Sequence, residues 1–69
     1  MEFSWTSFTA DDVARIIREC WLKPHEAKIL VLRWRGISIE NIAEQNHYSV
    51  SQTIRHSNTI KELITEHNM

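Results

Sequence analysis

Apolar residues recur at helical spacing in the first third of the chain. They fall at i, i+3, i+4, i+7 and i+8, and they are Val13, Ile16, Ile17, Cys20 and Trp21. This repeat is typical of the buried face of an amphipathic helix. Thr9 precedes it as a candidate N-cap, and Asp11 and Asp12 suit the positive end of the helix dipole. The pattern predicts a first helix after Thr9 that buries the whole set, Trp21 included.

A second helix is predicted from Pro24, because the fixed φ of proline suits the first helical turn. Gly36 can supply the left-handed conformation that commonly follows the end of a helix. Between them, the predicted core positions are Ala27, Leu30, Val31 and Trp34. Ile29 and Leu32 lie off this face, so the helix is apolar around most of its circumference. We expect it either to be central or to share a face with a second subunit.

Two further helices are predicted after Gly36. Ser38 can cap a short third helix, with Ile42 and Ala43 facing inward. A turn is expected over 46–48, and Ser49 with Gln52 has the spacing of a capping box. In the fourth helix, the residues expected to face the core are Ile54, Ile60, Leu63 and Ile64, assisted by either Val50 or Thr53 and by Ser57. The sequence therefore predicts an all-α fold, a small bundle of four helices.

Composition places this pattern in a small folded domain. The chain has 69 residues, of which 42% are hydrophobic and 25% charged. We expect an N-terminal arm over residues 1–8 and one domain over 9–69. A chain of this size is only marginally stable alone, which favours a homodimer. With one cysteine and no long apolar run, we expect a cytoplasmic protein that has no disulfide, does not enter the membrane and is not exported.

The charge is unevenly distributed along the chain. The formal net charge is −1, yet all eight Lys and Arg residues lie between positions 15 and 61. That span holds four acidic residues and so carries +4. The pattern is compatible with a basic face that has acidic edges, and equally with an ordinary mixed surface.

Two stretches of sequence resemble a known family. Residues 22–30 read LKPHEAKIL, and residues 35–43 read RGISIENIA. They are similar to the LuxR-type output domain and to region four of sigma factors, where Leu-Thr-Pro-x-Glu precedes an apolar helix, Gly-x-Ser-x-x-x-Ile-Ala and a Ser-capped recognition helix. The small Ala43 would let two helices cross closely. The resemblance covers residues 22–64 and implies a helix-turn-helix motif over about 38–64.

The chain departs from this family at two positions. The family usually has a glycine in the turn and a β-branched apolar residue four positions after the capping serine. Here the turn has His47, and the second position has Thr53, with Ile54 one residue later. The rotation of the fourth helix is therefore open by one residue, about 100°.

The resemblance implies that the fourth helix lies in the major groove of DNA. Base contacts would come from Gln52 to adenine and Arg55 to guanine, with Ser51 and either His56 or Thr59 beside them. Phosphate contacts would come from free helix amides and from Ser38, Ser49, Thr53 and Lys61. Without DNA, Gln52 is a capping residue and Arg55 a solvated charge.

We therefore expect a homodimeric, sequence-specific regulator of transcription that binds double-stranded DNA. The alternative is a protein-interaction module, such as a mimic of sigma region four that docks on RNA polymerase or another regulator, which the weak net charge would suit. We expect no enzyme activity, cofactor or metal, because the four histidines lack i, i+4 spacing and no catalytic motif is present. Dimer contacts could come from Phe3 and Trp5, from the first helix, or from Ile29 and Leu32.

Overall fold

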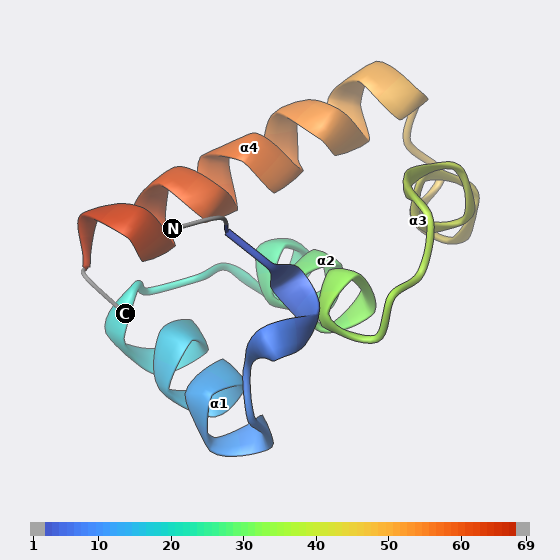
Figure 1. The fold of residues 1–69 in the computed structure, drawn as a ribbon. Helices are drawn as coiled ribbons and strands as arrows, with labels where there is room; N and C mark the ends of the chain where they lie inside the picture. The colour runs from blue at the N-terminus through green and yellow to red at the C-terminus, as the bar shows by residue number, and fades with distance from the viewer. Residues whose placement is uncertain (1–2, 68–69) are drawn as a thin grey trace.

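The computed structural model describes residues 3–67 and shows an entirely helical fold over that range (Figure 1). One 3-10 turn, η1 (Trp5–Ser7), precedes four α-helices. These are α1 (Ala10–Glu19), α2 (Pro24–Trp34), α3 (Ile39–Asn46) and α4 (Val50–Glu66). The prediction of a small all-α bundle of four helices is confirmed. None of the described helices has the length and apolar character needed to span a bilayer.

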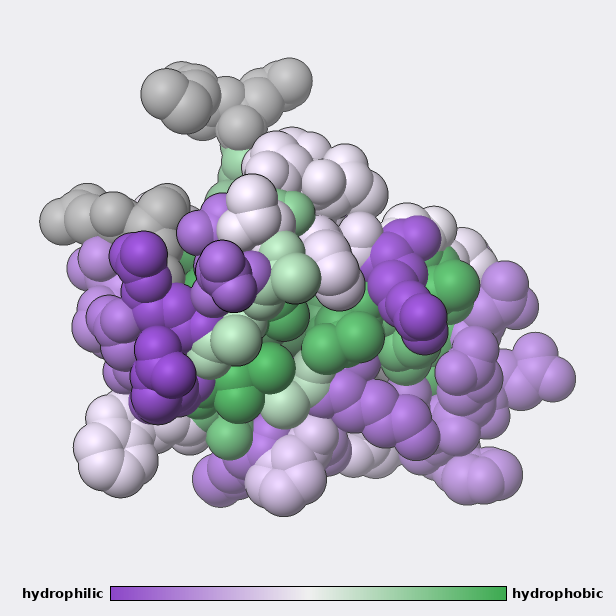
Figure 2. Space-filling view, turned by 90° about the horizontal axis from the view of Figure 1, so that it is seen from below, coloured by the Kyte–Doolittle hydropathy of each residue, from purple (hydrophilic) through white to green (hydrophobic). Residues whose placement is uncertain are grey.

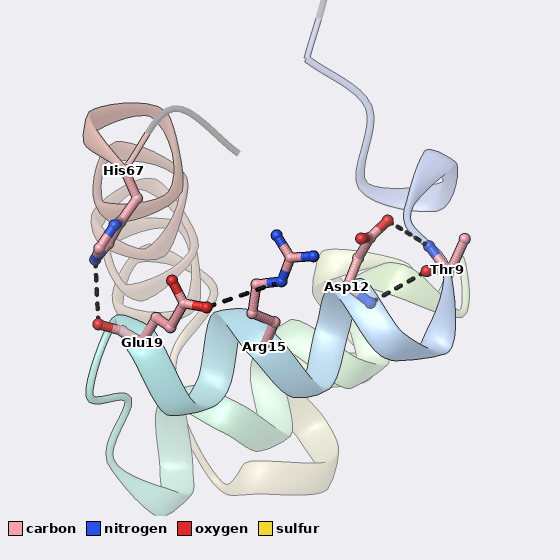
Figure 3. A network of polar contacts seen from close by, with 5 residues as sticks. All are labelled: Thr9, Asp12, Arg15, Glu19 and His67. Atoms are coloured by element: carbon pink, nitrogen blue, oxygen red, sulfur yellow. Dashed lines mark hydrogen bonds and ion pairs between the residues drawn. The ribbon is translucent and has the colours of Figure 1, made fainter.

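The first helix begins where the sequence predicts. The hydroxyl of Thr9 accepts a hydrogen bond from the backbone N–H of Asp12 at 3.1 Å, and the Asp12 carboxylate accepts one from the N–H of Thr9 at 3.0 Å (Figure 3). These two bonds form a capping box and satisfy amides that a helix start would leave free. The hydrogen bonds from Thr9 lower the pKa of the Asp12 carboxyl, because they favour its charged form.

Three helices end in the same way, with a backbone hydrogen bond that spans five residues and a left-handed residue inside it. The bonds run from Leu22 N to Ile17 O at 3.2 Å, from Ile37 N to Leu32 O at 3.0 Å, and from Tyr48 N to Ala43 O at 2.9 Å. The left-handed residues are Trp21 (φ 55°), Gly36 (φ 82°) and His47 (φ 58°). Only Gly36 is a residue that adopts this conformation without strain.

The first of these helix ends corrects a prediction. Trp21 was expected in the core with Cys20, but its side chain is 88% exposed. The helix stops at Glu19, and the left-handed backbone at Trp21 turns the indole away from the face that Val13 and Ile16 bury. The periodicity of the apolar residues therefore continues two residues beyond the helix.

The core is built around α2, which contacts α1, α3, α4 and η1. Figure 1 shows it in the middle of the molecule, with α4 above it and α1 below. Ile29 and Leu30 have no exposed surface. Of the predicted core residues of α2, only Leu30 is buried; Ala27, Val31 and Trp34 are half-buried, and Ile29, which was placed outside the core face, is buried. The expectation that this helix is central is confirmed.

The face of the molecule on the side of α1 is only partly covered by polar groups. Figure 2 shows apolar surface across the middle of this face, between strongly hydrophilic groups. Several apolar side chains that pack against the core are only half-buried, among them Phe8, Ile17, Leu22, Val31 and Leu32. This is the incomplete burial expected of so short a chain.

The N-terminal segment packs on this core. The indole N–H of Trp34 donates to the carbonyl of Phe8 at 2.7 Å, and the rings of Phe3 and Trp5 meet edge to face at 4.9 Å. The guanidinium carbon of Arg33 lies 5.2 Å from the centre of the Trp5 ring. Its Nε is buried and has no hydrogen-bond partner among residues 3–67, and the ring face supplies a favourable contact for this cation.

The last turn of α4 contacts the end of α1. The ring Nε2 of His67 lies 3.1 Å from the carbonyl oxygen of Glu19 (Figure 3), and the thiol of Cys20 lies 3.9 Å from the carbonyl of Leu63. Burial raises the pKa of the Cys20 thiol, and the neighbouring charge of Glu19 adds to this effect.

Candidate nucleic-acid interface

The candidate site begins where α3 and α4 meet. Figure 1 shows α3 nearly end on while α4 lies across the view, so the two helices cross. Ala43, on α3, is 3% exposed, and Ile42 beside it has no exposed surface. A methyl side chain at Ala43 permits the close approach that crossing helices need. The inward positions predicted for this helix are confirmed.

The turn between these helices depends on His47. It adopts the left-handed conformation at the place where the family that this chain resembles has a glycine. For a residue with a side chain, this conformation costs roughly 1–2 kcal/mol. Asn46 stabilises the same turn, since its side-chain amide donates to the carbonyl of Ile42 at 2.8 Å. The left-handed His47 and the side chain of Asn46 thus both belong to the turn that joins α3 to α4.

Helix α4 begins with the predicted capping box. The Ser49 hydroxyl accepts from the N–H of Gln52 at 3.1 Å, and the Gln52 side-chain oxygen accepts from the N–H of Ser49 at 3.1 Å. Gln52 is exposed, but its Oε1 is already engaged. A bidentate pair with adenine requires that oxygen to be shared or released, while the side-chain N–H groups take part in no hydrogen bond among residues 3–67.

The rotation of α4 is fixed by Thr53, which has no exposed surface, whereas Ile54 is 44% exposed. The prediction that Ile54 faces the core is therefore wrong. Either Val50 or Thr53 was expected to assist the core, and it is Thr53 that is buried, while Val50 is 43% exposed. The Thr53 hydroxyl can be buried because it donates to the carbonyl of Ser49 at 3.0 Å. Thr53 is thus the β-branched residue that this part of α4 buries. Because its side chain has no exposed surface, the expectation that it contacts a phosphate is wrong.

With this rotation, Ser51, Arg55 and Thr59 are exposed on the side of α4 away from the core. The only ion pair among the described residues joins Arg15 to Glu19 at 3.8 Å, so Arg55 has no acidic partner there. The hydroxyl of Thr59 donates to the carbonyl of Arg55 at 3.0 Å. Ser51 and Arg55 therefore have side chains available for a ligand.

His56 lies apart from this group. It is half-buried, and its ring centre lies 5.2 Å from those of His25, on α2, and Tyr48, in the turn. The contact between the two histidines was not predicted, because they are distant in the chain. The described residues contain no group of three side chains suited to a metal ion. His56 packs α4 against α2 and is not part of the outer face.

The two remaining predicted contact residues lie at separate places. The ammonium of Lys61 lies 5.4 Å from the centre of the Phe3 ring, on the side of α4 that faces the N-terminal segment. Ser38 is exposed at the start of α3, where its hydroxyl caps the N–H of Asn41 at 3.3 Å. The exposure of Val50 and Ile54 was not predicted, because both side chains are hydrophobic and were therefore expected to be buried.

Charge also distinguishes the start of α4. Residues 50–57 include Arg55 and no acidic residue, whereas residues 58–66 include Lys61, Glu62 and Glu66. The other exposed basic residues are distributed over α1, α2 and the connecting segments. The first half of α4 is thus the part of this helix that is compatible with a polyanion.

No protein-family model, curated protein or solved structure matches this chain. A function for this protein can therefore be inferred only from its own residues and their geometry.

Proposed function

We propose that this chain is a sequence-specific, double-stranded DNA-binding regulator of transcription, in which α3 and α4 form a helix-turn-helix motif. The proposal is carried by three residues that together set how α4 lies against α3: Ala43 and Thr53, which are buried, and His47, whose backbone is left-handed. Together they leave the first half of α4 with a polar, acid-free outer face. A helix presented in this way suits the major groove.

In the proposed complex, the N-terminal half of α4 faces the base edges. Arg55 pairs with guanine through its two N–H groups, and Ser51 lies one turn earlier on the same side. Val50 and Ile54 are exposed next to them and supply apolar surface for thymine methyl groups. The free amides at the start of α4 and the exposed Ser38 contact phosphates and set the orientation.

The test is a fluorescence-anisotropy titration of the purified protein with labelled duplexes at two salt concentrations. Arg55→Ala is expected to weaken binding to the preferred duplex about 5- to 150-fold, the effect of losing one bidentate base contact. Lys28→Ala is the control, since it removes one exposed basic residue from α2. Equal effects of the two variants, or no salt-dependent binding to any duplex, would contradict the proposal.

A selection of bound sequences from a random duplex pool would extend this test. A homodimer of such a motif is expected to select an inverted repeat whose half-sites lie about one helical turn apart. Selection of a single half-site without symmetry would instead indicate binding as a monomer.

A second candidate function is a protein-interaction module that docks on RNA polymerase or another regulator. It is favoured by the net charge of −1 and by the exposed apolar pair Val50 and Ile54 beside the polar face of α4. Nuclease treatment separates the two functions. A partner complex that survives nuclease, from a chain with no affinity for DNA, would support the second candidate and exclude the first.

A further inference from the structure

Trp21 is the most exposed large apolar residue that the structure describes, at 88%. Its backbone is left-handed, with φ of 55°, a conformation that is unusual for a bulky side chain. The proposed contact between α4 and DNA makes no use of it, because it follows the end of α1, which contacts the last turn of α4 and not its start. Large exposed aromatic residues are typical anchors of protein interfaces.

A groove of about 330 Å³ lies beside this indole. Cys20 and Leu63 give it an apolar floor, and Glu19 and Glu66 give it acidic edges. His67 lines it as well and has a polar contact with the backbone of Glu19. The volume is at the lower limit of pockets that hold a small-molecule ligand, and it suits a single large side chain.

Trp21 itself lines the groove, and exposed residues of both charges lie close to it in the sequence. Arg18 precedes Trp21, and Lys23 follows it, and both are exposed. Glu19 and Glu66 at the groove are exposed as well, although Glu19 has a weak surface ion pair with Arg15 at 3.8 Å. Because the indole and the groove belong to one surface, a two-fold axis can bring each indole to the groove of the other copy.

We propose that two copies of this chain associate through this surface, with the Trp21 indole of each inserted into the groove of the other and Lys23 facing Glu66 across the interface. Three of the residues considered from the sequence for dimer contacts are occupied within one chain. Ile29 has no exposed surface, and Phe3 and Trp5 pack on the core. This association does not use the residues of α4 that are proposed to contact DNA.

The contact is small, which determines its strength. Two buried indoles contribute about 150–250 Å² each, well below the roughly 1,200 Å² of a stable interface. The dimer is therefore weak in solution and becomes populated when two copies are bound side by side on one duplex, which raises their effective concentration.

Sedimentation equilibrium over a wide concentration range, without DNA, tests the proposal. The mass is expected to rise from monomer toward dimer, and Trp21→Ala is expected to weaken association at least about tenfold. Val50→Ala, which truncates an exposed apolar residue at the other end of α4, is the control and is expected to leave association unchanged. Trp21→Gly should also lose association while melting at or above Trp21→Ala, because glycine accepts the left-handed backbone. That result separates loss of the contact from loss of the fold.

Charge exchange tests the arrangement of the interface. Lys23→Glu and Glu66→Lys should each weaken self-association, and an equimolar mixture of the two variants should associate more strongly than either alone. A monomeric mass at every concentration, wild-type association of the Trp21 variants, or a mixture no stronger than its components would overturn the proposal. Each of these outcomes leaves the DNA titration of Arg55→Ala unaffected, so the two proposals fail separately.

Discussion

The two halves of α4 belong to one helix but are packed by different chemistry. In residues 50–57 the buried side chains are Thr53 and Ser57, both hydroxyls, and two apolar side chains are exposed. In residues 58–66 the buried side chains are Ile60 and Ile64. The second half is the anchored half, and the first half is positioned by its cap and its close contact with α3.

This difference suggests a division of roles along the helix. Dispersion and burial stabilise the second half, and the contacts of Lys61 with Phe3 and of His67 with Glu19 add to them. The first half packs small polar side chains against its neighbours, and its outer surface can therefore vary without loss of the fold. A binding surface placed on that half is supported by the rigid half behind it.

The largest expected difference between the two halves is in the free energy of unfolding of two variants, Ile60→Ala and Ile54→Ala, which truncate the same residue type in each half. Ile60 has no exposed surface, and its truncation is expected to cost about 2–5 kcal/mol of unfolding free energy. Ile54 is 44% exposed, and its truncation is expected to cost under about 0.5 kcal/mol. Urea unfolding of both variants measures the difference, and similar costs would remove the distinction between the two halves.

Ser49→Ala is expected to have an intermediate effect, because the first half depends on its cap. Loss of the hydroxyl that accepts from the N–H of Gln52 should cost about 0.5–2 kcal/mol. Ser51→Ala is the control, since Ser51 is exposed two residues later and its hydroxyl takes part in no hydrogen bond among the described residues. Thermal unfolding should show a clear decrease only for Ser49→Ala, and an equal decrease in both would mean that the cap contributes nothing.

Thr53→Val is expected to have the smallest effect, within about 1 kcal/mol of the parent. The carbonyl of Ser49 retains its bond from the N–H of Thr53 at 3.0 Å, so removal of the hydroxyl leaves no buried acceptor unpaired. Thr53→Ser, which removes the methyl group instead, should be the more destabilising of the pair. The reverse order in denaturant unfolding would show that the hydroxyl, and not the shape of the side chain, is required at this position.

The starts of the helices and the end of α2 were predictable because local chemistry determines them. Thr9, Ser38 and Ser49 accept hydrogen bonds from the first turn that follows each of them, Pro24 starts α2, and Gly36 ends it. Each of these signals acts within a few residues in the chain, so no knowledge of the tertiary fold is needed to recognise it.

Two of the errors share one cause, which is that hydrophobicity was used to assign burial. Trp21 and Ile54 were placed in the core, yet both are exposed, and Thr53 is buried in place of Ile54. A left-handed helix end decided the first case, and a hydroxyl satisfied by the preceding turn decided the second. Neither effect appears on a hydropathy scale.

The candidate site was predictable only in part. Ser51 and Arg55 project outward as expected, because the capping box already fixed the start of α4. The contact of His56 with His25 was not predictable, since it depends on how α2 and α4 pack. Side chains that meet through tertiary packing have no signature in the local sequence.

The position of the only cysteine gives the molecule a chemical reporter of its own opening. The thiolate is the form that attacks an alkylating reagent, and burial between α1 and α4 raises the pKa of Cys20, so the closed molecule presents little of the reactive form at neutral pH. Alkylation of Cys20 should therefore follow the rate at which the end of α1 separates from α4. Cys20 also forms the floor of the groove beside Trp21, which the proposed dimer covers. The rate of alkylation should therefore fall as the protein concentration rises.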